Sequence, residues 1–158
     1  MLIDNIEIIC PAVYPKDAYS SAEVFGSMIW LWSKFDYYSE AALGEASELI
    51  LATITSKNFA LFCQAGQPVG YVNWAWLDKD QAEKCKLKQL SYRQLIDCQE
   101  KGEDKQLWIL SWFCLSEKSN HFTMYRLLNK VIFKGIKVHF SYHKSVEGSL
   151  SRFYTKQC

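Results

Sequence analysis

The chain has 158 residues, of which 49% are hydrophobic and 22% are charged, and its formal net charge is +1. This length and composition suit one globular domain with its own core. A net charge so close to zero gives no overall field toward nucleic acid or an anionic membrane, so we expect neither as a partner. Aromatic residues make up 15% of the chain, and such side chains line clefts as well as cores.

The six cysteines and three histidines do not predict a metal site. No two cysteines form a C-x-x-C pair, and the histidines lack zinc-finger spacing. The N-terminal stretch has no basic region of the kind that begins a signal peptide, and no apolar run is long enough to span a membrane. We therefore expect a cytoplasmic protein with reduced thiols and without a bound cofactor.

The first half of the chain predicts two helices and a hairpin. Residues 5–12 alternate weakly and predict an N-terminal strand or arm. Apolar residues recur at helical spacing over 17–34, and a second helix fits 39–54 with Ser39 as its N-cap. Residues 58–77 then read as two short strands around a Gly-Pro turn.

The second half alternates helices with strands. Residues 78–101 predict a charged helix, capped by Asp78 and closed by Gly102. Residues 105–115 form the strongest strand, apolar on both faces and therefore central in a sheet. A helix over 120–133 and a last strand over 135–144 complete the order α-α-β-β-α-β-α-β. This order favours an α/β fold, a GNAT-like mixed sheet flanked by helices.

Four stretches carry a resemblance to a known family. Gly26 precedes Trp-Leu-Trp at 30–32, and "QPVGYVNWAWL", "WILSW" and "FKGIKVH" follow in order. Over about residues 25 to 140 the chain resembles the RTX toxin-activating lysine acyltransferases. The resemblance implies a GNAT-like fold. It also implies transfer of a fatty acyl chain from acyl carrier protein to lysines of a co-encoded toxin in the cytosol. The boundaries that we expect are an extension at 1–24, the acyltransferase-like domain at 25–145 and a tail at 146–158.

The sequence departs from the family at two positions that matter for catalysis. Members use a histidine shortly after Trp-Leu-Trp and an aspartate in the Trp-x-x-Asp-Trp strand, and these positions hold Tyr38 and Ser111 here. A tyrosine with an ordinary pKa of about 10 is a poor base at neutral pH, and a serine can orient a group but supplies no charge. Tyr38 and Ser111 are nevertheless the candidate catalytic residues.

Five further residues are candidates for binding substrate: Trp30, Trp32, Asp36, Trp74 and Trp112. Each also has a structural interpretation. Trp30 and Trp32 are two apart and so face different sides of a helix. Asp36 could cap a helix, and Trp74 and Trp112 could belong to the core.

Two hypotheses for function follow. In the first, the fold performs a different acyl-type transfer on a toxin or bacteriocin precursor. A related branch serves microcins, whose C-terminal carboxylate is esterified to a glucosylated catechol siderophore, so an activated siderophore is an alternative donor to acyl carrier protein. In the second, the chain is an inactive subunit that presents the toxin peptide to a partner maturation protein or stabilises that partner. A homodimer is a further alternative.

Overall fold

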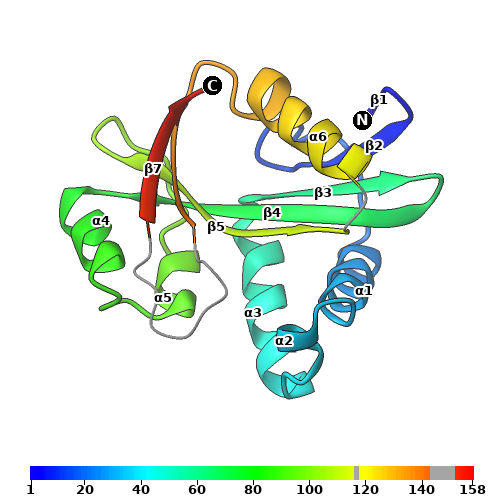
Figure 1. Ribbon diagram of the computed structural model, residues 1–158, viewed down its shortest axis with the longest axis horizontal. Coiled ribbons are helices and arrows are strands. Elements are labelled where there is room, and N and C mark those ends of the chain that lie inside the picture. The colour runs from blue at the N-terminus through cyan, green and yellow to red at the C-terminus, as the bar shows by residue number, and fades with distance from the viewer. Residues whose placement is uncertain (116–117, 143–151) are drawn as a thin grey trace.

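The computed structural model describes residues 1–115, 118–142 and 152–158. A seven-stranded sheet, whose strands lie side by side in the order of the sequence, forms its centre (Figure 1). The strands are β1 (Leu2–Ile3), β2 (Ile6–Ile9), β3 (Phe59–Gln64), β4 (Gln67–Leu77), β5 (Gln106–Cys114), β6 (Lys137–Tyr142) and β7 (Arg152–Gln157). Neighbouring strands are antiparallel, except that β5 and β6 run parallel. The predicted mixed α/β sheet is therefore confirmed.

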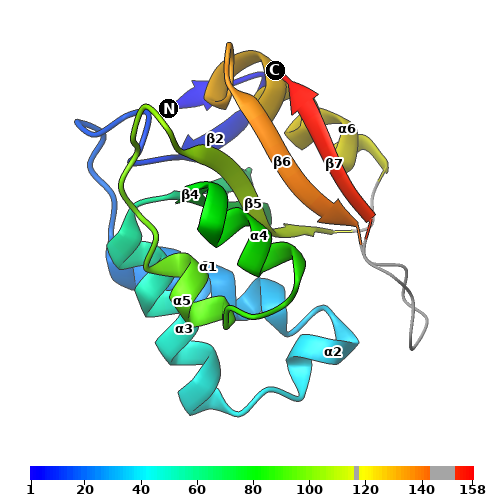
Figure 2. The ribbon, with the colours of Figure 1, turned by 90° about the vertical axis from the view of Figure 1, so that its left-hand side faces the viewer.

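Helices cover both faces of this sheet. They are α1 (Ser21–Trp32), α2 (Asp36–Ser39), α3 (Leu43–Ser56), α4 (Lys79–Lys86), α5 (Tyr92–Ile96) and α6 (Lys118–Leu127), which continues as the π-helix η1 (Leu128–Ile132). The helices α1 to α5 lie on one face and α6 on the other (Figures 1 and 2). Side chains of β4 alternate between the two layers: Tyr71 packs with α1 and α3, whereas Val72 packs in the cluster that contains residues of α6.

The hairpin and the central strand agree with the sequence analysis, but the hairpin turn differs. Ala65 and Gly66 form a two-residue turn with φ of 49° and 77°, and Gln67 and Pro68 already belong to β4. Two successive positive φ values suit a tight hairpin and favour glycine at the second position. The prediction of a Gly-Pro turn was therefore wrong by two residues.

Two helix predictions were wrong at their ends. Ser39 does not cap α3. Its hydroxyl donates to the carbonyl of Asp36 at 2.9 Å within α2, and α3 starts after Ala42 without a side-chain cap. The predicted helix over 78–101 is two short helices, because the chain turns at Lys88 with φ of 56° and Ser91 starts α5 with a capping box. Asp78 caps α4 as expected, whereas Gly102 ends no helix.

The strand expected at 135–144 is not the last one in the chain. A further strand, β7, pairs with β6 along its whole length, from Lys137 opposite Gln157 to Tyr142 opposite Arg152. The strands β1, β2 and β7 thus belong to the same sheet as the central strands.

The sheet opens between β5 and β6. Their parallel pairing covers only Leu107–Ile109 of β5 and Val138–Phe140 of β6. On its other side, β5 stays paired with β4 up to Cys114, with a bulge beside Asn73 and Trp74. Beyond Ile109 the two parallel strands therefore diverge (Figure 1).

Candidate active site

Two cavities meet at Ser111. The first, the β5–β6 cavity, has a volume of about 320 Å³ and lies between β5, β6, β7 and the end of α6. The second, the α3 cavity, has a volume of about 510 Å³ and lies between α2, α3, α5 and β5. Ser111 lines both of them. Ser111 follows the point at which β5 and β6 diverge, so it belongs to the lining on both sides of β5.

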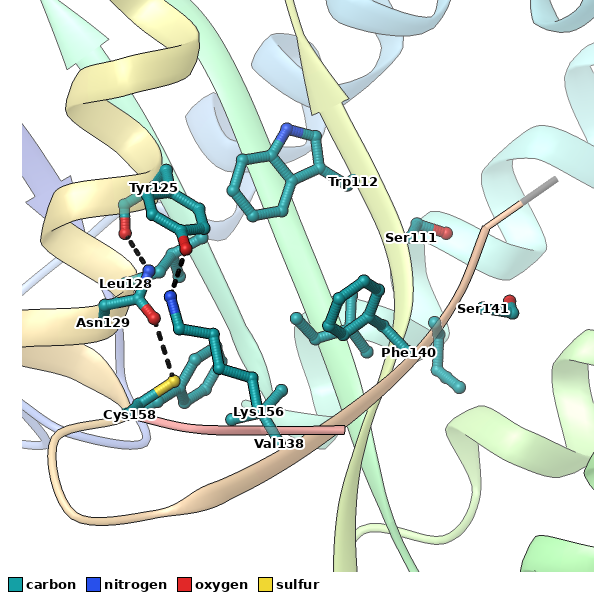
Figure 3. A pocket seen from close by; sticks show the side chains of 13 residues that line it. Ser111, Trp112, Tyr125, Leu128, Asn129, Val138, Phe140, Ser141, Lys156 and Cys158 are labelled. Carbon is teal, nitrogen blue, oxygen red and sulfur yellow. Dashed lines mark hydrogen bonds between the residues drawn. The ribbon is translucent and has the colours of Figure 1, made fainter. Parts of the chain in front are cut away.

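The β5–β6 cavity is mainly apolar. Ile109, Leu128, Phe133, Val138 and Phe140 supply most of its wall. Figure 3 shows Trp112 and Phe140 facing this space, with Ser111 and Ser141 at one end and Lys156, Asn129 and Cys158 at the other. Such a lining suits an aliphatic or aromatic ligand that carries few polar groups.

The α3 cavity contains a chain of neutral hydrogen-bonding groups. The Tyr92 hydroxyl donates to Oδ1 of Asn73 at 3.1 Å, and Nδ2 of Asn73 donates to the Thr53 hydroxyl at 3.4 Å. The Tyr92 hydroxyl also hydrogen-bonds Ser111. Because Tyr92 has a single proton, Ser111 is the donor in that contact. Burial raises the pKa of Tyr92 to about 12, so the whole chain is uncharged at neutral pH.

Tyr38 lies in the same cavity as Ser111, against an aromatic wall. Its ring centroid is 4.9 Å from that of Trp32 and 4.8 Å from that of Phe113. The Trp32 indole N–H donates to the Tyr71 hydroxyl at 2.5 Å, and burial raises the pKa of Tyr71. The short helix α2 brings Tyr38 back over the end of α1, so residues 38 and 111 face one space although 73 positions separate them.

The five candidate binding residues fall into two groups. Trp32 lines the α3 cavity, and Trp112 lines the β5–β6 cavity. Trp74 is buried and packs edge-on against Phe133 at 5.0 Å, which is the structural interpretation. Trp30 lies under the Lys34 ammonium at 4.7 Å, and Asp36 is exposed at the start of α2. Neither of these last two lines either cavity.

Sequence reasoning missed Tyr92, Glu40 and Glu45, all of which line the α3 cavity. The capping box that starts at Ser91 was the available signal for the position of Tyr92, because it fixes where α5 begins. Glu40 and Glu45 carry the only carboxylates among the described residues that line this cavity. They offer a negative charge to an acceptor.

The histidines contribute to neither cavity within the described part of the chain. His139 stacks on Trp108 with ring centroids 5.2 Å apart and contacts the Thr155 hydroxyl at 3.0 Å through Nδ1. Burial and Lys137 lower its pKa. His121 is exposed on α6, and His143 falls outside the described residues. Cys114 is buried in the layer opposite Phe113, as its spacing from Ser111 predicts.

Residues 1–115, 118–142 and 152–158 contain neither a metal-binding cluster nor a membrane-spanning helix. No group of three or more His, Cys, Asp or Glu side chains lies close enough to hold a metal ion. No helix in these ranges has the length and apolar character of a membrane span.

Residues 17–155 match the model of a family described as HlyC, the RTX toxin acyltransferase family. The chain belongs to this family. Among curated proteins, it is 25% identical over 131 residues to the protein-lysine myristoyltransferase RtxC of Kingella kingae, which covers 82% of the chain and 74% of the relative. The resemblance based on its four sequence stretches is thus confirmed, and family membership makes the chain a transferase of the acyltransferase type.

Solved structures support the fold. A putative acetyltransferase from Pyrococcus horikoshii superposes with a TM-score of 0.51 at 11% identity, covering 90% of this chain. The match spans only 40% of the length of that acetyltransferase chain. An N-acetyltransferase from Staphylococcus aureus Mu50 gives a TM-score of 0.39 at 8% identity, over 77% of this chain and 75% of the other. The superposition on the Pyrococcus horikoshii structure, together with the mixed sheet flanked by helices, confirms the expected GNAT-like fold.

Proposed function

We propose that this acyltransferase-family protein acts in the cytoplasm to attach an acyl-type group to a toxin or bacteriocin precursor encoded beside it. The observation that carries the proposal is the convergence of two cavities on Ser111. A transferase must bring a donor and an acceptor to one point while it keeps their remaining parts apart. Two cavities that share Ser111 in their linings suit that arrangement.

The donor's apolar chain occupies the β5–β6 cavity in this proposal. Its lining suits the aliphatic part of a fatty acyl group delivered by acyl carrier protein. Strand β5 has no strand partner on the β6 side beyond Ile109 within the described residues, so its backbone groups there are available to hydrogen-bond the donor. The donor's carbonyl carbon then lies near Ser111.

The acceptor enters through the α3 cavity. Its attacking nitrogen or oxygen forms a bond to the donor's carbonyl carbon, the carbon–sulfur bond of the thioester breaks, and the acceptor's proton leaves with the thiolate. Tyr38 donates a hydrogen bond that orients the reacting carbonyl, and Ser111, whose own proton goes to Tyr92, accepts a hydrogen bond from the acceptor. Glu40 or Glu45 attracts a cationic acceptor or accepts its proton. This division of roles replaces the histidine and aspartate that the family resemblance implies at positions 38 and 111.

The neutral character of the site supports a finer proposal about the substrate. Tyr92, Asn73 and Ser111 form an uncharged network where the resemblance implies an aspartate. In the esterification of a microcin to a catechol siderophore, a sugar hydroxyl attacks an activated form of the peptide's terminal carboxyl. The bond from the carbonyl carbon to the activating group breaks, and the hydroxyl proton leaves with that group, so no lysine has to be deprotonated. The aromatic wall of Trp32, Tyr38 and Phe113 suits a flat aromatic ligand. In this alternative the siderophore occupies the α3 cavity and is the group that becomes attached to the peptide.

The same absence of a strong base favours a second candidate function. A subunit that binds the toxin peptide for a partner maturation protein needs the cavities but no proton transfer. In that case the α3 cavity holds the peptide, and the partner protein supplies the chemistry.

Intact-mass analysis of the co-expressed toxin separates the two candidates. We expect the added mass with the wild-type chain and with Tyr154→Phe, an exposed control on β7. We expect it to disappear when the chain is deleted, and to fall at least tenfold with Tyr38→Phe or Ser111→Ala while circular dichroism shows a folded protein. If deletion abolishes the mass but neither substitution reduces it, the binding subunit becomes the better description. If deletion leaves the mass unchanged, both candidates are wrong.

A further inference from the structure

We propose that Lys156 and Tyr125 close the far end of the β5–β6 cavity and thereby limit the length of the acyl chain that the protein accepts. The inference rests on the proposed function, because it assigns the cavity to the donor's chain. It goes further by naming the residues that select among donors.

The strand register fixes the direction of the cavity. Val138 lies opposite Lys156 on β7, and Phe140 lies opposite Ile109 on β5. Ser141, the next residue of β6, lies at the same end as Ser111 (Figure 3). The three residue-to-residue steps of β6 from Ser141 to Val138 span about 10 Å. A chain whose carbonyl is held at Ser111 therefore runs along β6 toward Lys156.

The far end of the cavity is polar and internally bonded. The Lys156 ammonium lies 4.0 Å from the centre of the Tyr125 ring and donates to the Tyr125 hydroxyl. Beside it, the Cys158 thiol donates to Oδ1 of Asn129 at 3.1 Å, and Nδ2 of Asn129 donates to the Tyr125 carbonyl at 2.5 Å. Figure 3 shows these contacts together at one end of the apolar space.

The helix that carries two of these residues changes its winding at this point. The α-helix α6 ends at Leu127 and continues as a π-helix from Leu128 to Ile132. Such single π-turns are rare and occur frequently at functional sites. Here the wider turn contains Leu128, which faces the apolar part of the cavity, and Asn129, which faces the polar end.

The ammonium makes this end a barrier to a longer chain. A methyl terminus that reached Lys156 would have to displace a charged group from its aromatic and hydroxyl partners and cover it with hydrocarbon, which is unfavourable. A volume of about 320 Å³ holds about ten methylene groups, if each occupies roughly the ~30 Å³ of a water molecule in the liquid. We therefore expect an optimum near ten to twelve carbons.

The test is a binding series with saturated fatty acids of 8, 10, 12, 14 and 16 carbons, measured by displacement of a fluorescent fatty acid from the full chain. Up to the limit, each two-carbon step should improve affinity about fifteenfold, because each buried methylene contributes about fourfold. Beyond twelve carbons the wild-type affinity should stop rising. Lys156→Met should move that limit upward by at least two carbons, whereas Lys156→Arg should keep it.

A matched control is Lys130→Met, which removes an exposed lysine from η1 that does not line the cavity. Lys130→Met should leave the dependence of affinity on chain length unchanged. An affinity that rises steadily to 16 carbons in the wild type would overturn the proposal, as would an unchanged limit in a folded Lys156→Met variant. Pantetheine that displaces the probe when no fatty acid does would also overturn it. Because this assay measures binding, its result is independent of whether the toxin is modified.

Discussion

The Tyr92 hydroxyl links the stability of the fold to the candidate site, and removing it gives the sharpest test of the site's geometry. Tyr92→Phe deletes the donor to Asn73 and the acceptor from Ser111 while it keeps the ring. Asn73 is 1% exposed, so its oxygen loses its partner where water has little access. Such a loss costs about 1–3 kcal/mol of unfolding free energy at pH 8.

The difference in unfolding free energy between the wild type and Tyr92→Phe should become smaller at alkaline pH. Burial raises the pKa of Tyr92 from 10.0 to about 12, so the neutral form contributes stability that is complete below pH 10 and is lost as pH rises toward 12. At pH 11 an unfolded tyrosine with a pKa of 10 is mostly ionised and the folded one is not, which costs the wild type about 1.4 kcal/mol relative to pH 8. The phenylalanine variant does not pay this penalty. The difference in unfolding free energy between the wild type and Tyr92→Phe should therefore be about 1.4 kcal/mol smaller at pH 11 than at pH 8.

Urea unfolding followed by tryptophan fluorescence at pH 8 and pH 11 measures both quantities. Other groups with raised pKa values, such as Tyr71 and Cys10, are present in both proteins and cancel in the difference. Tyr154→Phe serves as the exposed control and should show neither effect. A gap that is equal at the two pH values would refute the enclosed hydroxyl on which the neutral network depends.

Three other perturbations test the packing around the site. Gly70→Ala should lower the unfolding free energy by about 1–3 kcal/mol. An added Cβ would lie 2.4 Å from the Phe113 carbonyl oxygen and 2.5 Å from the Met124 sulfur. Thermal unfolding measures the loss of stability, and an unchanged melting temperature would contradict the close approach. Lys57→Gly should raise the unfolding free energy by about 0.5–1 kcal/mol, since Lys57 ends α3 with a φ of 61°, which glycine adopts without strain. Urea unfolding measures the change, with Lys34→Gly as the control. A loss of stability in Lys57→Gly would contradict the prediction. A thiol reagent at pH 8 should label the partly exposed Cys85, Cys98 and Cys158 before the three buried cysteines. Burial raises the pKa of Cys10 to about 12 and the pKa values of Cys63 and Cys114 to about 11, so these thiols form little reactive thiolate. Peptide mass mapping over time measures the order of labelling, and early labelling of Cys10 would contradict the prediction.

Local sequence patterns predicted the parts of the fold that depend on neighbouring residues. The runs over 58–64 and 69–77 read correctly as a hairpin, and 105–115 as a strand inside the sheet, because strand propensity is a local signal. The expected burial of that strand on both faces holds only near its two ends, since Trp112 is exposed. The strand β7 was missed although Phe153, Tyr154 and Thr155 favour strands. Its side chains are largely exposed, so it lacks the apolar alternation that marked the other strands.

The candidate site was likewise predicted only in the part that the sequence motifs reach. Counting from the family's motifs placed Tyr38 and Ser111 together, and both line the α3 cavity. Tyr92 was beyond such reasoning. Its contact with Ser111 joins α5 to β5 across 19 residues, and only the break between α4 and α5 turns it inward. A continuous helix over 78–101, as predicted, would have hidden that break.

The uncharged network constrains how catalysis can proceed at this position. An aspartate at 111 would place a buried carboxylate beside the Tyr92 hydroxyl and Asn73, and it would need a positive partner to offset its desolvation. With serine there, no such partner is needed, and the described residues supply no histidine to either cavity. In the proposed reaction Tyr38 therefore polarises the carbonyl and Ser111, whose proton goes to Tyr92, accepts from the acceptor, so proton removal falls to Glu40, Glu45 or the leaving thiolate. An acceptor that loses its proton late, as a hydroxyl attacking an activated acyl group does, fits such a site better than an ammonium that must lose it first.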